Sequence, residues 1–93
     1  MLYLVAYDIP QDHNPLRQRV AEKLMDYGLQ RIQKSVFIGR ISRNRAEMLA
    51  LELREMLRKV SCQLHIVPVC TRCSRGIIAV AGSQLEEEEV LVV

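Results

Sequence analysis

The chain has 93 residues, 49% hydrophobic and 26% charged, which is the composition of one folded domain with a modest core. No stretch reaches the roughly 20 apolar residues of a membrane span, and the first residues lack the basic region of a signal peptide, so we expect a cytoplasmic protein without a membrane partner. The net charge of +2 is unevenly spread. Because Glu86–Glu89 lie together, residues 1–85 carry thirteen Lys and Arg against seven Asp and Glu.

The first segment, residues 2–8, predicts a buried strand that ends at a carboxylate. Its first six side chains are all apolar or aromatic, as a strand covered on both faces requires. Pro10 has no N–H to donate and forces Ile9 into an extended conformation, so strand pairing ends near Asp8. Asp8 is the first charged side chain, either a solvated strand end or a metal ligand held by a rigid element. The pattern alone leaves both readings open.

The next segment predicts a loop over residues 11–13 and a helix over residues 15–27. Apolar side chains recur at helical spacing through the second stretch. Asn14 is a good N-cap, Pro15 suits the first helical position because its missing N–H has no partner there, and Gly28 favours a C-terminal stop. These three residues define both ends of the helix.

Two strands are indicated over residues 29–33 and 36–40, where β-branched and aromatic residues are interleaved with polar ones. The strands join tightly near Lys34 and Ser35, which predicts an antiparallel hairpin. Gly39 marks either a bulge or the close approach of another backbone.

A second helix is predicted over residues 45–59, followed by a strand over residues 63–69. Asn44 and Glu47 have the spacing of a capping box, and the helical stretch is rich in strong helix formers. Pro68 cannot donate to a neighbouring strand, so the far end of the last strand is an edge or a bend.

A loop over residues 70–76 and a short strand over residues 77–81 complete the predicted elements. The order is βαββαβ with an extra C-terminal strand, an α+β arrangement of the ferredoxin-like type with both helices on one face of the sheet. We expect residues 1–82 to form this domain and a second copy to cover the bare face, as a homodimer. Residues 83–93 are expected to be a tail or strand that pairs with a sheet edge of that copy.

Arginine dominates the basic residues, with ten Arg against three Lys. The guanidinium group matches phosphate oxygens in a bidentate geometry, so an Arg-rich surface favours nucleic acid as a partner. A basic surface that only keeps the protein soluble is the alternative.

The three cysteines do not predict a disulfide framework, because their number is odd. Cys62 and His65, followed by Cys70 and Cys73, have the spacing of zinc ligands. However, two residues three apart on a strand point to opposite faces, which argues against zinc here.

Four short motifs together resemble the Cas2 family of CRISPR-associated proteins, small proteins described as metal-dependent endoribonucleases. The resemblance covers about residues 1–69, and the motifs come in the family's order. They are Ala6-Tyr7-Asp8-Ile9, Arg17-Gln18-Arg19-Val20, Asp26-Tyr27-Gly28 and Gln33-Lys34-Ser35-Val36-Phe37.

The resemblance implies a ferredoxin-like homodimer with one metal-binding Asp per subunit at the dimer axis. Asp8 occupies the matching position, so we expect it to be both a Mg²⁺ ligand and the catalytic residue of phosphodiester hydrolysis. Two-fold symmetry turns one Asp8 into a pair. Tyr7, its neighbour, is a secondary candidate. The expected substrate is single-stranded RNA, duplex DNA or both.

Other site residues follow from the same resemblance. Arg17 and Arg19 match basic residues of the family's first helix and are expected to hold phosphate. Ser35 and Phe37 match a segment near the family's site, although Phe37 equally suits core or dimer packing. Asp12 is a secondary candidate, because family members often carry a second acid in that loop.

The resemblance also implies a second, non-catalytic function. Cas2 proteins form a complex with the Cas1 integrase during acquisition of new spacers, where the dimer bridges integrase dimers along a DNA duplex. In that role we expect Arg40, Arg43 and Arg45 to contact phosphates without reading sequence. A dimer related to ribonuclease toxins of similar fold is the remaining alternative.

Overall fold

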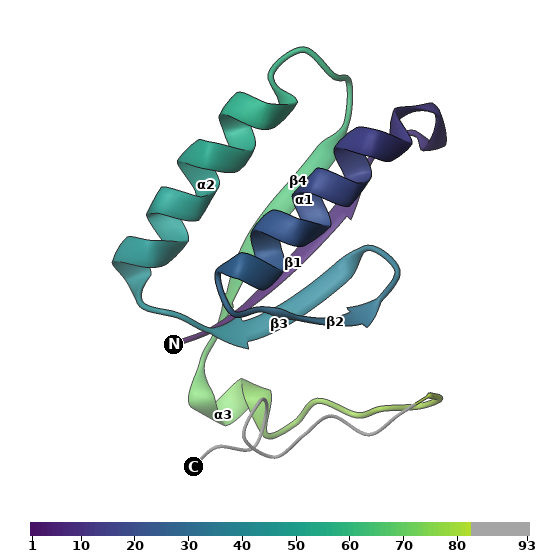
Figure 1. Cartoon of the computed structure of the whole chain (residues 1–93). Coiled ribbons are helices and arrows are strands. Elements are labelled where there is room, and N and C mark those ends of the chain that lie inside the picture. Colours follow the sequence, from purple (N-terminus) through teal and green to yellow (C-terminus); the bar gives the residue numbers. More distant parts are fainter. Residues whose placement is uncertain (83–93) are drawn as a thin grey trace.

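The structure, a computed structural model, describes residues 1–82. Its element order is the predicted βαββαβ, with two short helical turns added (Figure 1). The elements are β1 (Leu2–Asp8), the 3-10 turn η1 (Gln11–His13), α1 (Asn14–Asp26), β2 (Gln30–Gln33), β3 (Val36–Arg40), α2 (Arg43–Leu57), β4 (Gln63–Val69) and α3 (Thr71–Ser74).

The four strands form one antiparallel sheet in the order β2-β3-β1-β4. This strand order, with both long helices on one face, is the ferredoxin-like fold that the sequence predicts (Figure 1). β1 lies at the centre, paired with β3 over Leu2–Ala6 and with β4 over its whole length. The predicted bounds of β1, β3 and β4 are confirmed.

The main core lies between the sheet and the two long helices. Alternate residues of β1 face the helices, and they pack with Phe37 of β3 and the apolar stripes of α1 and α2. The helical members of this core are Leu16, Val20, Ala21, Leu24, Ala46, Leu49 and Leu53. The other residues of β1, Asp8 among them, therefore face away from the helices.

The sheet face away from α1 and α2 is also partly covered. Leu2 and Ile38 are only 1% and 0% exposed, although they do not belong to the helix-facing core. Figure 1 shows α3 and residues 75–82 on this side of the sheet. Val67 on the same face is 44% exposed, so an apolar surface remains.

α1 begins differently from the prediction and ends as predicted. The turn η1 runs directly into the helix, so His13 is the N-cap and Asn14 is already helical; its side chain instead accepts a hydrogen bond from Arg17. The prediction that Asn14 is the N-cap is therefore wrong. At the other end Gly28 has a φ of +94°, and the N–H groups of Gly28 and Leu29 donate to Met25 and Leu24. These two bonds are a Schellman motif.

α2 begins two residues earlier than predicted, because Ser42 rather than Asn44 is its N-cap. The Ser42 hydroxyl accepts a hydrogen bond of 3.1 Å from the backbone N–H of Arg45. The predicted capping box is therefore wrong, and Glu47 instead forms an ion pair of 2.9 Å with Arg43 one turn back.

One carboxylate joins the two long helices. Glu52 of α2 accepts a hydrogen bond of 3.0 Å from the Tyr27 hydroxyl and forms an ion pair of 2.9 Å with Lys23 of α1. The pKa of Glu52 is lowered most by the hydrogen bond from Lys23 and next by the hydrogen bond from Tyr27. The pKa of Lys23 is raised mainly by its hydrogen bond to Glu52. Burial, and then Glu52, raise the pKa of Tyr27.

The hairpin decides between the two expectations for Gly39. A bulge does occur, but in β2 between Arg31 and Gln33. At Gly39 an added Cβ would lie 2.9 Å from the Cα of Leu29 and 3.0 Å from the carbonyl oxygen of Gly28. Gly39 is therefore required by the close approach of the chain that leaves α1.

The chain after β4 departs from the prediction. Residues 71–74 form one helical turn, α3, where a loop was expected, and residues 77–81 do not form a strand within the described chain. A strand needs a hydrogen-bonded neighbour, and this segment reaches none there; Ile78 and Val80 are 81% and 92% exposed. The predicted tail, 83–93, lies outside the described residues. Within residues 1–82 no helix is both long and apolar enough to cross a membrane.

Candidate nucleic-acid interface and metal site

Asp8 ends the central strand with an exposed carboxylate. Its backbone pairs with Gln63 of β4, and the backbone N–H of the preceding Tyr7 donates a hydrogen bond of 3.0 Å to the carbonyl of Ser35 in the β2–β3 turn. The buried Ile9 follows directly, so the chain on both sides of Asp8 is fixed. We call this part of the molecule, where β1 ends and the β2–β3 turn lies, the Asp8 end of the sheet.

Asp8 alone does not form a complete metal site in one chain. Within the described residues no group of three or more His, Cys, Asp and Glu side chains converges on a common point. A hard cation such as Mg²⁺ prefers oxygen ligands and keeps several waters, so one carboxylate per chain fits it if a second copy and phosphate supply further oxygens. Asp12, in η1, is exposed and lies 4.0 Å from the imidazole of His13.

A cation pocket lies at the Asp8 end, on the helix side of the sheet. It has a volume of about 370 Å³ and is lined by Tyr7, Asn14, Arg17, Gln18, Arg31 and Lys34. Three of these side chains are cationic and none is acidic. The pocket is therefore suited to an anion such as phosphate.

Two guanidinium groups of this pocket are held in place. An Arg17 Nη donates a hydrogen bond of 3.2 Å to the Asn14 side chain, while its Nε is buried without a hydrogen-bond partner in the described chain. Arg31 lies over the Phe37 ring, 5.0 Å from its centroid, and Phe37 in turn stacks on Tyr7 at 6.3 Å. A bound anion would satisfy the buried Nε, which otherwise costs free energy.

Phe37 contributes to the pocket as a buried residue that packs under Arg31. Its side chain is fully buried in the helix-facing core, so of the alternatives open for it the structure shows core packing. It supports Arg31 rather than meeting solvent itself. Ser35 is half-buried, and Arg19 is exposed on α1.

The remaining expected basic residues lie at the opposite end of the sheet. Arg40 pairs in register with Leu2, at the start of β1, and α2 begins beside it. Arg43 is bound to Glu47, and Arg45 lies 4.7 Å over the Tyr27 ring, where it also donates to the Tyr27 carbonyl at 3.5 Å. The structure thus separates the expected nucleic-acid residues into two groups.

Sequence reasoning missed Arg31 and Lys34 as members of the pocket. The signal lies in the register of the hairpin, which sets Arg31 directly opposite Phe37. The turn itself lies at Lys34 and Ser35, as predicted, but a bulge between Arg31 and Gln33 shifts the pairing by one residue and brings Arg31 beside Phe37.

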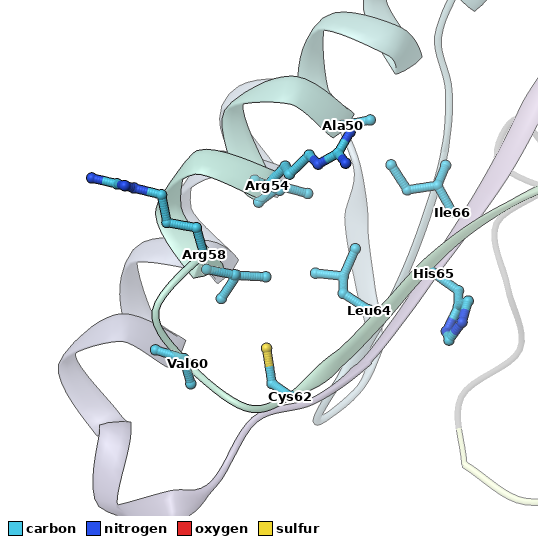
Figure 2. A pocket seen from close by; sticks show the side chains of 10 residues that line it. Ala50, Arg54, Arg58, Val60, Cys62, Leu64, His65 and Ile66 are labelled. Carbon is cyan, nitrogen blue, oxygen red and sulfur yellow. The ribbon is translucent and has the colours of Figure 1, made fainter.

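The zinc spacing gives no zinc site within the described chain. Figure 2 shows Cys62 and Leu64 pointing toward α2, while His65 points away on the other side of β4. Cys62 and Leu64 line an open groove of about 630 Å³ between α2 and β4. Cys62 and His65 thus point to opposite sides, as the alternation of side chains along a strand predicts.

Comparisons with known proteins identify the family. The model of the family described as CRISPR associated protein Cas2 matches residues 1–77. A protein of Archaeoglobus fulgidus named CRISPR-associated endoribonuclease Cas2 1 is 38% identical over 92% of this chain and 89% of its own length. The similarly named Cas2 2 of Chloroflexus aurantiacus is 48% identical, over 84% and 92% of the two chains.

Solved structures agree with the fold. A crystal structure of Streptococcus pyogenes Cas2 at pH 6.5 aligns with a TM-score of 0.75 over 87% of this chain and 100% of that chain, at 22% identity. A hypothetical protein of Thermus thermophilus, TT1823, aligns with a TM-score of 0.70 at 35% identity, over 88% and 90%. The sequence motifs, the ferredoxin-like sheet and these matches lead to one conclusion: the chain belongs to the CRISPR-associated Cas2 family.

Proposed function

We propose that this chain is a Mg²⁺-dependent endoribonuclease that works as a homodimer. Asp8 of each copy is a metal ligand, and the cation pocket binds the phosphate backbone of the RNA. The observation that carries the proposal is the placement of a solvent-facing carboxylate and a three-cation pocket at the same end of the sheet. Relatives named endoribonucleases support RNA as the substrate class.

The geometry favours a polynucleotide over a small phosphate ester. By strand alternation, Asp8 faces away from the helices, while the pocket opens on the helix side next to Tyr7. A single strand that crosses this end of the sheet would place one phosphate at Asp8 and a neighbouring one in the pocket. The cations then hold and orient the chain, and the reacting phosphodiester lies at the carboxylate.

A bound Mg²⁺ would supply a water of lowered pKa and positive charge for the phosphate oxygens. Asp8 holds the ion from the end of a strand whose backbone is fixed on both sides, which keeps the carboxylate in position. Arg31, fixed on Phe37, and Arg17, fixed by Asn14, stabilise negative charge on the bound strand. The apolar surface away from the helices supports a second copy as its cover, which would bring two Asp8 residues together.

The test is cleavage of labelled single-stranded RNA and duplex DNA, in Mg²⁺ or EDTA, by wild type and Asp8→Asn. We expect Asp8→Asn to lower the rate of RNA cleavage by at least about 100-fold. Its elution volume in size-exclusion chromatography and its melting temperature should stay those of wild type. Asp26→Asn, which removes another exposed carboxylate from α1, is the control and should cleave like wild type. Cleavage that survives both EDTA and Asp8→Asn would refute the metal-site assignment.

A non-catalytic role has its own observation. A Thermoproteus tenax protein named CRISPR-associated endonuclease Cas1/endonuclease Cas2 fusion is 36% identical over 77% of this chain, which covers 26% of the fusion. This supports association of the present chain with Cas1. If wild type cleaves no substrate, and wild type and Asp8→Asn both co-purify with Cas1, this role is favoured.

A further inference from the structure

Two cysteines far from the Asp8 end are held together where the chain leaves β4. Cys70 follows the last residue of β4 and is the N-cap of α3, and its Sγ accepts a hydrogen bond of 3.3 Å from the backbone N–H of Cys73. Both side chains are exposed and both thiols are free. This pair takes no part in the proposed nuclease site.

The turn that carries the two thiols is well ordered by its own bonds. The backbone N–H of Ser74 donates to the Cys70 carbonyl at 2.9 Å, and the Ser74 hydroxyl donates to the Thr71 carbonyl at 2.7 Å. Ser74 is also fully buried. Residues three apart in such a turn have Cα atoms about 5 Å apart, within the range of about 4.4–6.8 Å that disulfides span.

We propose that Cys70 and Cys73 form a reversible dithiol–disulfide site that exchanges with small-molecule disulfides such as glutathione disulfide. The Cys70 thiolate attacks one sulfur of glutathione disulfide, forms a mixed disulfide and releases one glutathione thiolate, which takes a proton from solvent. Cys73 then loses its proton, attacks the Cys70 sulfur and releases the second glutathione. Two electrons pass from the protein dithiol to glutathione disulfide, giving one intramolecular disulfide and two glutathione thiols.

The surroundings favour Cys70 as the attacking thiol. The pKa of Cys70 is lowered by hydrogen bonds from the Cys73 backbone N–H and thiol, while the pKa of Cys73 is raised because its thiol donates to Cys70. Arg72 lies between the two cysteines and Arg75 two residues after Cys73; both side chains are exposed and attract the anionic glutathione disulfide. Cys62, by contrast, is half-buried in the groove between α2 and β4.

The experiment uses the full chain, reduced and then exposed to glutathione disulfide at pH 7, quenched with acid and alkylated. Trypsin cleaves after Arg72, between the two cysteines, so the proposed disulfide joins peptide 60–72 to peptide 73–75. Peptide 60–72 also contains Cys62, so fragmentation of the linked peptides in the mass spectrometer identifies the cysteine that is bound. We expect this crosslink to form at least about tenfold faster than Cys62 is glutathionylated. It should reverse on addition of reduced glutathione.

Three serine variants make the result specific. Cys73→Ser should stop at a glutathione adduct on Cys70, and Cys70→Ser should give no crosslink although its hydroxyl still caps α3. Cys62→Ser is the matched control and should behave as wild type. Equal modification of all three thiols, or an adduct on Cys70 in wild type that never resolves to the crosslink, would overturn the proposal.

Discussion

The cation pocket predicts how RNA binding depends on salt. Each phosphate that a protein cation neutralises releases counterions, which contributes about 0.7 to the slope of log K against log salt for a single strand. Replacing Arg17, Arg31 and Lys34 by Gln therefore should lower the magnitude of the slope by about two units. When the salt concentration rises from 50 to 200 mM, RNA affinity should fall by a factor that is about 20 times smaller for the variant than for wild type.

Fluorescence anisotropy with labelled single-stranded RNA, titrated at several salt concentrations in EDTA to prevent cleavage, measures this slope. The same net charge is removed elsewhere by replacing Arg54, Arg58 and Lys59 with Gln, on and after α2 and away from the pocket. We expect the control to keep most of the wild-type slope. If both triple variants flatten the slope equally, RNA responds to net charge alone and the pocket is not a phosphate site.

Two further predictions concern stability. Gly39→Ala should lower the free energy of unfolding by about 1–3 kcal/mol in urea denaturation, because its Cβ meets backbone at 2.9 Å; Gly76→Ala, whose Cβ meets one carbonyl oxygen at 3.5 Å, is the control, and an equal loss in both would contradict the close-approach argument. Glu52 has a lowered pKa in the folded state, so its contribution is complete above its ordinary value of about 4.5 and declines as the pH falls through the folded value. The stability difference between wild type and Glu52→Gln should therefore shrink below about pH 4.5, and a difference that stays constant there would contradict the ion pair.

Most of the fold follows from local pattern, and the errors have local causes. The continuous apolar run and Pro10 fix β1, and Gly28 fixes the end of α1, because these signals act within a few residues. The N-caps of the helices were harder to predict. Ser42 and Asn44 are both good N-cap residues, for example, and the path of the incoming chain decides which of them caps α2. The segment 77–81 looks like a strand, but a strand needs a neighbour that sequence pattern does not supply.

The candidate site was predictable only in part for a similar reason. Asp8 could be found from its position after an apolar strand, because that depends on one segment. The pocket draws on α1, β2 and the β2–β3 turn, and Arg31 enters it only through its register opposite Phe37. A bulge in β2 shifts that register by one residue, which no periodicity within the strand reveals.

The central place of β1 has a consequence for synthesis on the ribosome. The strand is made first, yet its partner β4 comes last of the four, with Leu2 paired to Val69 and Asp8 to Gln63. Until residues 63–69 leave the exit tunnel, β1 can pair on one side only and its other edge stays open to any extended chain nearby. Asp8 gains its paired backbone only at that last step, so a truncated nascent chain carries the carboxylate without the strand partner that positions it.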